Sequence, residues 1–88
     1  MATADLYAEL RPLLFSIAYR MLGTVSEAED ALQEAFLRFH RAVRDGTEVD
    51  NPKAYLTTTL TRLSLDVLGS ARRQRESYVG EWLLEPLL

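Results

Sequence analysis

Apolar residues recur every three or four positions through three successive segments of this 88-residue chain, and this spacing most constrains its fold. Such a repeat places the apolar side chains on one face of a helix, whereas a half-buried strand needs strict alternation. No segment shows convincing alternation, and there is no internal repeat or low-complexity tract. A chain of this length can form one core but not two. We therefore predict a small all-α bundle of three to four helices.

The first helix is predicted to run from about Ala4 to Leu22, before Gly23, which can take the left-handed conformation that closes a helix. Pro12 interrupts the pattern, since an interior proline lacks a donor and clashes with the preceding turn. We expect the helix to be kinked or broken there. The residues assigned to its core side are Leu6, Leu10, Leu13, Leu14, Phe15, Ile17, Tyr19 and Met21.

The second helix is predicted to start with a capping box, in which Ser26 and Glu29 satisfy free backbone N–H groups of the first turn. It should extend to about Arg44 and end at Asp45-Gly46. Good helix formers dominate this segment. The predicted core stripe comprises Ala28, Ala31, Leu32, Ala35, Phe36, Phe39 and Val43.

The third helix is predicted to start at Asn51-Pro52, a cap residue followed by proline at the first helical position. It should reach Leu68, because Gly69-Ser70 weakens it and leaves the arginines beyond on a frayed turn or a loop. From Glu76 onward there is no clean period, so we expect an irregular tail. Trp82 there either anchors the tail on the domain or contacts another domain. The predicted buried residues are Leu56, Leu60, Leu63 and Val67.

Composition argues against several classes of protein. No stretch approaches the roughly 20 apolar residues of a membrane span, and the amino terminus does not resemble a secretion signal. The absence of cysteine suits a cytoplasmic protein and leaves no thiolate metal site. The single histidine, His40, is expected at the surface. No catalytic constellation is recognisable, so we expect no enzyme activity, no metal, no cofactor and no small-molecule substrate.

Charge is segregated along the chain although its net value is only −3. Residues 1–50 carry five Arg against nine Asp and Glu, a net of −4. Residues 51–75 carry five basic residues against Asp66, a net of +4, and residues 76–88 add three Glu. Two fields of opposite sign favour two different partners, and the basic one is the candidate for phosphate contact.

Two polar helix faces are candidate binding surfaces. Asp30, Gln33 and Glu34 share one face at spacings of three and four, just before the apolar Ala35 to Leu37. From the residues alone, a merely solvated face is the favoured interpretation. A second polar face lies opposite the buried side of the third helix, where threonines cost helical stability and their hydroxyls could contact phosphates or base edges. A harmless polar face is equally compatible there. This second set comprises Thr57, Thr58, Thr61, Arg62 and Leu65.

Further basic and aromatic residues flank the second face. Lys53 and the run from Arg72 to Arg75 are either solvated helix ends or phosphate contacts. Tyr55 could stack on an unpaired base, although a partly packed tyrosine is the favoured interpretation.

Three blocks appear in order along the chain: residues 11–23 (Arg-Pro-Leu-Leu-Phe-Ser-Ile-Ala-Tyr-Arg-Met-Leu-Gly), residues 27–38 (Glu-Ala-Glu-Asp-Ala-Leu-Gln-Glu-Ala-Phe-Leu-Arg) and residues 51–56 (Asn-Pro-Lys-Ala-Tyr-Leu), the last followed by Leu-Ser-Leu-Asp. Together they resemble region 2 of an extracytoplasmic-function (ECF) sigma factor. The tail is similar to a Tyr-Val-Gly-Pro-Trp-Leu-Pro-Glu-Pro linker, from which it departs at Glu81 and Leu84. That linker marks a subgroup with a SnoaL-like C-terminal extension.

The resemblance implies that residues 1–75 form the region 2 domain and residues 76–88 start the linker to a region 4 that this chain does not encode. It implies binding to the β′ clamp helices of core RNA polymerase, and recognition and melting of the promoter −10 element through the non-template strand. An anti-sigma factor or a C-terminal regulatory domain is a further implied partner. The rival hypothesis is a helical protein-interaction module that uses its acidic face without binding DNA.

The resemblance also assigns site residues. The polymerase-binding set is Asp30, Gln33, Glu34, Leu37 and Arg41. The DNA-binding set is Lys53, Tyr55, Thr58, Thr61, Arg62, Leu65, Arg72, Arg73 and Arg75.

Overall fold

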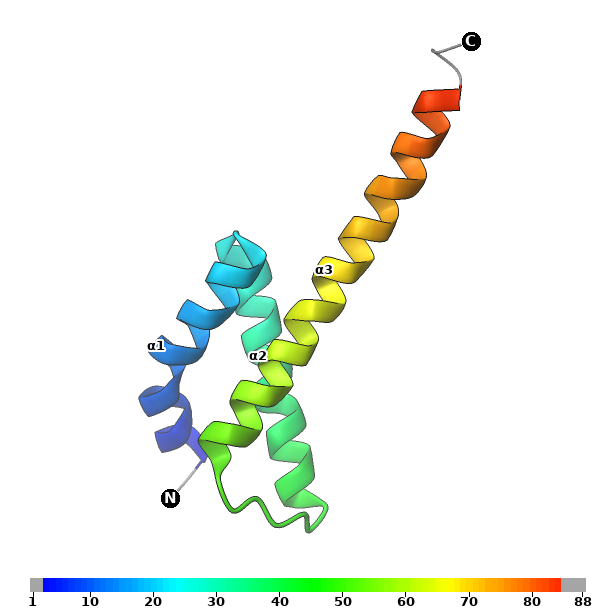
Figure 1. The fold of residues 1–88 in the computed structure, drawn as a ribbon. Coiled ribbons are helices and arrows are strands. Elements are labelled where there is room, and N and C mark those ends of the chain that lie inside the picture. Colours follow the sequence, from blue (N-terminus) through cyan, green and yellow to red (C-terminus); the bar gives the residue numbers. More distant parts are fainter. Residues whose placement is uncertain (1–2, 85–88) are drawn as a thin grey trace.

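Three helices make up the computed structural model, which describes residues 3–84 and the side chains of residues 5–72 and 74. They are α1 (Thr3–Leu22), α2 (Val25–Arg44) and α3 (Pro52–Leu84). Each helix packs against the other two, as Figure 1 shows. Residues 3–84 contain no strand. The predicted all-α bundle is confirmed.

The core lies along the line where the three helices meet. Two aromatic pairs flank it: the rings of Tyr7 and Phe36 join α1 to α2 at 4.7 Å, and those of Phe39 and Tyr55 join α2 to α3 at 5.8 Å. Aromatic pairs at such distances contribute roughly 0.5–1.5 kcal/mol beyond their buried area. The buried apolar residues are Leu10, Leu14, Ala18, Ala28, Ala31, Leu32, Ala35, Phe36, Phe39, Leu56 and Leu60.

Helix α1 passes through Pro12 without a break, so only the kinked alternative of the prediction holds. Its first turns, in dark blue, lie at an angle to the rest in Figure 1. Both Pro12 and Ala8, whose carbonyl loses its helical donor at Pro12, are exposed. Water can therefore satisfy that carbonyl, and the proline costs less than it would in a buried helix.

The buried stripe of α1 is narrower than predicted. Leu10, Leu14 and Ala18, four residues apart, form it. The assignment of Tyr19 to the core is wrong, because its side chain is 44% exposed and stacks on Phe15 at 6.0 Å. Tyr19 follows Ala18 directly, and one residue is a rotation of about 100° around the helix, which carries it off the stripe.

The start of α2 differs from the prediction by two residues. Gly23, with φ +87°, closes α1, and its N–H donates to the Tyr19 carbonyl. The cap is Thr24, not Ser26: its hydroxyl accepts from the Glu27 N–H at 3.1 Å and donates to the Glu27 carboxylate at 3.1 Å. Thr24 to Glu27 fits the same capping pattern as the predicted box, and the closing glycine immediately before it selects the earlier frame.

The other helix ends follow the sequence signals. Helix α2 ends at Arg44, and Gly46 has φ +90° in the turn beyond it. The Asn51 side chain accepts from the Ala54 N–H at 3.1 Å, which confirms it as the cap of α3. Val43, however, is 48% exposed and does not belong to the core stripe of α2.

Helix α3 continues to Leu84, so the predicted end at Leu68 and the irregular tail over residues 76–84 are wrong. The chain elongates to 63 Å as a result, with α3 rising past the α1–α2 turn in Figure 1. Val67, predicted to be buried, is 38% exposed, and the side chains of Leu65, Asp66 and Leu68 around it are exposed as well. The Trp82 side chain lies outside the described residues.

Ser64 occupies a core position of α3 that the sequence did not mark. Its side chain is fully buried, and its hydroxyl has no hydrogen-bond partner among the described residues. Because an unpaired buried hydroxyl costs roughly 1–3 kcal/mol and alanine is the better helix former, Ser64→Ala should raise the free energy of unfolding by about 1 kcal/mol. Urea denaturation would measure the change.

The matched control for this prediction is Ser70→Ala, at an exposed position of the same helix. It gains the helix propensity of alanine, worth roughly 0.5 kcal/mol, without removing a buried hydroxyl. If both variants gain the same stability, the Ser64 hydroxyl is not the destabilising group.

Candidate protein and nucleic-acid interfaces

The predicted polymerase-binding residues share one side of α2, which we call the α2 outer face: Asp30, Gln33, Glu34, Leu37 and Arg41. Helical rotation places this face directly opposite the buried stripe of α2. All five side chains are exposed or half-buried, and Leu37 is 48% exposed. Leu37 is thus an exposed apolar side chain among polar neighbours on this face.

Glu34 already has a partner on its own helix. Its carboxylate accepts from the Arg38 side chain at 3.1 Å, one helical turn away. Both side chains are about half exposed, so this pair contributes only about 0.3–0.5 kcal/mol. Another cation can therefore displace Arg38 from Glu34 at little cost.

A shallow apolar depression adjoins the α2 outer face where α1 crosses α2. Its lining includes Tyr7 of α1 and Phe36 of α2, two residues that were not predicted to belong to a site. Gln33, Leu37 and His40 complete it, and His40 is exposed as predicted. Only the crossing of the two helices brings Tyr7 here, so no local sequence pattern could have identified it.

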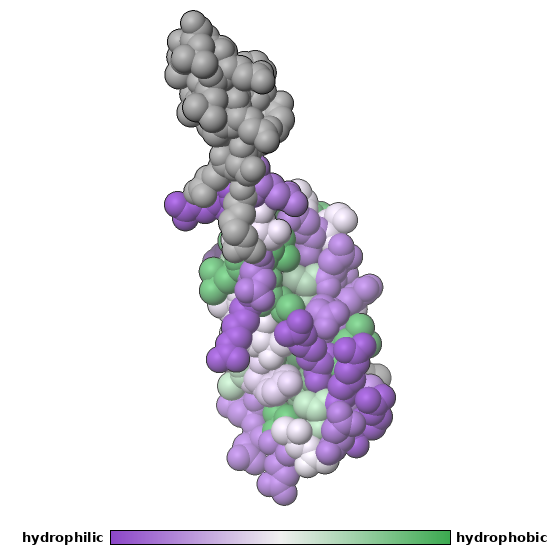
Figure 2. Space-filling model, turned by 90° about the vertical axis from the view of Figure 1, so that its right-hand side faces the viewer, coloured by the Kyte–Doolittle hydropathy of each residue, from purple (hydrophilic) through white to green (hydrophobic). Residues whose placement is uncertain are grey.

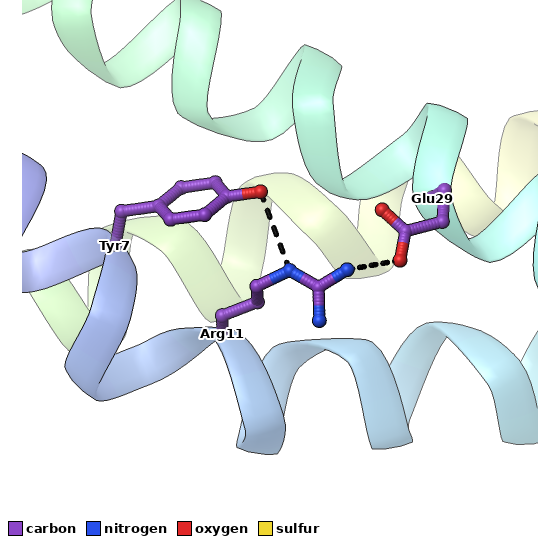
Figure 3. Close-up of polar contacts among 3 residues, drawn as sticks. All are labelled: Tyr7, Arg11 and Glu29. Carbon is purple, nitrogen blue, oxygen red and sulfur yellow. Dashed lines mark hydrogen bonds and ion pairs between the residues drawn. The ribbon is translucent and has the colours of Figure 1, made fainter.

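A polar bridge holds α1 against the start of α2 beside this face. Figure 3 shows the Arg11 guanidinium between Tyr7 of its own helix and Glu29 of α2. Arg11 donates to the Tyr7 hydroxyl at 3.3 Å and forms an ion pair with Glu29. The bond to Tyr7, followed by that to Glu29, raises the pKa of Arg11. Glu29 therefore fixes the helix packing next to Asp30 and does not cap α2 as predicted.

Four of the predicted DNA-binding residues share the opposite side of α3 from its core, which we call the α3 outer face: Thr58, Thr61, Arg62 and Leu65. Arg62 is exposed, and it makes no hydrogen bond or ion pair with the part of the chain that the structure describes. Thr61 donates to the Thr57 carbonyl at 2.8 Å, so its oxygen is left to accept. Leu65 is 55% exposed.

The remaining predicted DNA-binding residues are dispersed. Tyr55 is half-buried against Phe39, as the favoured interpretation held. Lys53 lies at the first turn of α3, where it lines a shallow depression together with Thr58 of the α3 outer face. Arg72 is exposed two turns beyond Leu65. The side chains of Arg73 and Arg75 lie outside the described residues.

The two outer faces point in different directions. Each lies opposite the buried stripe of its own helix, and the stripes of α2 and α3 face one another across the core. Figure 2 shows one side of the molecule, mainly hydrophilic, with small separate hydrophobic patches. On this side, the hydrophobic residues at the surface lie in small patches among hydrophilic ones.

Other kinds of site have no support in the described residues. Residues 5–74 contain no cluster of His, Asp and Glu that could hold a metal ion. None of the helices, so far as they are described, combines the length and apolar character needed to cross a bilayer. The described residues thus form a helical core with two polar faces.

The chain belongs to the Sigma-70 region 2 family, whose model matches residues 6–75. Its relatives are ECF RNA polymerase sigma factors. It is 48% identical over 82 residues to SigJ of Mycobacterium tuberculosis, a match that covers 93% of this chain and 25% of SigJ. It is 32% identical over 78 residues to SigW of Bacillus subtilis, covering 88% of this chain and 40% of SigW.

A third relative is the probable ECF sigma factor SigI of Mycobacterium tuberculosis, 38% identical over 74 residues. This match covers 82% of this chain and 25% of SigI. The chain therefore spans about a quarter of the length of SigJ and of SigI. No solved structure matches it at a significant level.

Proposed function

We propose that this chain is a sigma factor domain that joins core RNA polymerase and opens the promoter −10 element. The observation that supports the proposal is that the outer faces of α2 and α3 lie on different sides of one shared core. The chain that carries these two faces belongs to the Sigma-70 region 2 family. Such a domain would act in the cytoplasm, as a binding module and not as an enzyme.

The α2 outer face is the proposed surface for the β′ clamp helices of the polymerase. Carboxylates at its edge would attract a basic partner and set the register of the complex, while Leu37 would supply the apolar anchor. The depression beside Leu37 extends the surface onto α1 and offers the partner a second apolar contact.

The α3 outer face is the proposed surface for the non-template strand. Capture of bases that unstack transiently needs phosphate anchors and apolar or aromatic contacts, but no hydrolysis. Arg62 would hold a phosphate or a base edge, Thr58 and Thr61 would supply hydroxyl oxygens, and Leu65 would contact a base. Arg72, with Arg73 and Arg75, would extend the phosphate contacts along the next turns.

Residues 76–88 are proposed as the start of a linker to region 4. Their likeness to the linker of the subgroup with a SnoaL-like extension supports placing the chain in that subgroup. An anti-sigma factor or a C-terminal regulatory domain would then be a further partner of this region.

The direct test is whether the domain binds a β′ clamp-helix fragment and a −10 single strand through surfaces that can be mutated independently. For the DNA, Arg62→Ala should weaken binding of a short −10 oligonucleotide by about 5- to 30-fold, the loss of about 1–2 kcal/mol. Fluorescence anisotropy at several salt concentrations would measure it. If Arg62 contacts a phosphate, the salt dependence should fall by roughly 0.7 in slope.

The matched control is Arg20→Ala, which removes the same charge from an exposed position on α1. It should change binding of the oligonucleotide much less than Arg62→Ala does. Equal affinities of the parent and the Arg62→Ala variant would contradict the DNA surface and favour a protein-interaction module that does not bind DNA.

A further inference from the structure

A groove lies at the other end of the bundle from the extension of α3, between the start of α1, the end of α2 and the loop that joins α2 to α3. Its volume is about 570 Å³. Leu10 and Phe39, which are nearly buried, form its floor. Leu6, Val43 and Val49 form its walls. The groove is therefore a continuation of the core that opens to solvent.

This groove is distinct from both outer faces. None of the residues of the α2 outer face or the α3 outer face lines it. Val43 shows that apolar surface is left uncovered here, because this residue continues the apolar stripe of α2 and its side chain is 48% exposed. The groove thus accounts for a residue that the sequence assigned to the core.

The rim of the groove is acidic. In the loop, Thr47, Val49 and Asn51 line the groove, whereas Glu48 and Asp50, which alternate with them in the sequence, are exposed and do not line it. Glu9 lines it from α1. Lys53 also lines it, and Asp45 is paired with Arg44 at 3.4 Å.

This charge pattern indicates which kind of partner the groove would bind. In the lining, the carboxylate of Glu9 is balanced by the ammonium of Lys53, so the excess negative charge comes from the exposed Glu48 and Asp50, the sequence neighbours of lining residues in the loop. The carboxylates would repel a phosphate backbone. A peptide with both apolar and cationic side chains could instead cover the apolar floor and pair with the carboxylates. A helix presents apolar residues at spacings of three and four with cations on either side of them, which suits a groove of this kind.

We propose that this groove is a docking site for a basic amphipathic helix of a partner protein. Apolar side chains of the helix would enter between Val43 and Val49, and its Lys or Arg residues would face Glu48 and Asp50. Such a contact would leave the α2 and α3 outer faces open, so the partner could bind together with polymerase and DNA.

The test uses two synthetic helical peptides of about 18 residues with the same leucine stripe, one with lysines and one with glutamates on the polar face. Isotope-labelled domain would be titrated with each and followed by NMR. The lysine peptide should bind and shift amide signals of residues 43–53, and the glutamate peptide should bind at least about tenfold more weakly. Val43→Asp should weaken the binding of the lysine peptide about tenfold or more.

Two variants separate this site from the other surfaces. Glu48→Lys combined with Asp50→Lys should reverse the preference between the peptides while the domain still binds a β′ clamp-helix fragment. Leu37→Asp, on the α2 outer face, should leave lysine-peptide binding unchanged. Equal binding of both peptides, or lysine-peptide shifts centred on the α2 outer face, would overturn the proposal. So would displacement of the lysine peptide by a single-stranded oligonucleotide that shifts the same signals.

Discussion

Replacing Asp30, Gln33 and Glu34 together with alanine should weaken binding to a β′ clamp-helix fragment by roughly 30- to 800-fold, about 2–4 kcal/mol. The reason is that the variant removes both carboxylates and the amide from the α2 outer face while leaving the core stripe intact. Isothermal titration calorimetry with the purified fragment would measure the change. Because alanine is a good helix former, the helix content should be unchanged.

The matched control replaces Glu48 and Asp50 with alanine. It removes the same number of negative charges, two, but from the exposed loop before α3. That variant should lower the association rate slightly and leave the dissociation rate unchanged, since the two carboxylates lie outside the proposed interface. A triple variant that binds as tightly as the parent would show that the α2 outer face is not the polymerase surface.

Leu60→Ala should have the largest effect on stability, a loss of about 2–5 kcal/mol in the free energy of unfolding. The Leu60 side chain is fully buried in the core cluster that the three helices share, so its truncation leaves a cavity in that core. A chain of this size has a total stability of roughly 4–13 kcal/mol, so the loss is a large fraction of it. Thermal unfolding followed by circular dichroism should show a decrease in Tm of about 10 °C or more.

Leu65→Ala is the control for that substitution, because Leu65 lies on the same helix and is 55% exposed. It should change the stability by less than about 0.5 kcal/mol. Similar losses for the two variants would mean that Leu60 does not pack in the core as described. The Leu65 variant has a second use, since it should weaken binding of the −10 oligonucleotide without unfolding the domain.

The sequence predicted those parts of the fold that depend on local chemistry. The closing role of Gly23 and the cap at Asn51 followed from backbone conformation and hydrogen bonding within a few residues. The error at Ser26 arose because two overlapping segments fit one capping pattern, and only the position where α1 ends decides between them.

The errors at Val43 and Val67 have a tertiary cause. Periodicity shows which residues share a face of a helix, but it does not show how far the neighbouring helices extend along that face. Val43 and Val67 continue apolar stripes past the point where partners cover them, and both are exposed. The same reasoning explains the candidate site: α2 and α3 each present the predicted faces, whereas Tyr7 joins the first of them only through the crossing of two helices.

Because α3 continues without a break past its packed part, a small change in the tilt of that part moves the far end of the helix by a larger distance. From Ser64 to Leu84 the helix advances by about 30 Å at 1.5 Å per residue. A tilt of only about 10° at the packed half would therefore displace the far end by roughly 5 Å. A small change in the packing of Leu56 and Leu60 would therefore produce a larger displacement at the far end of α3, and the Gly69-Ser70 pair lies where a helix bends most readily.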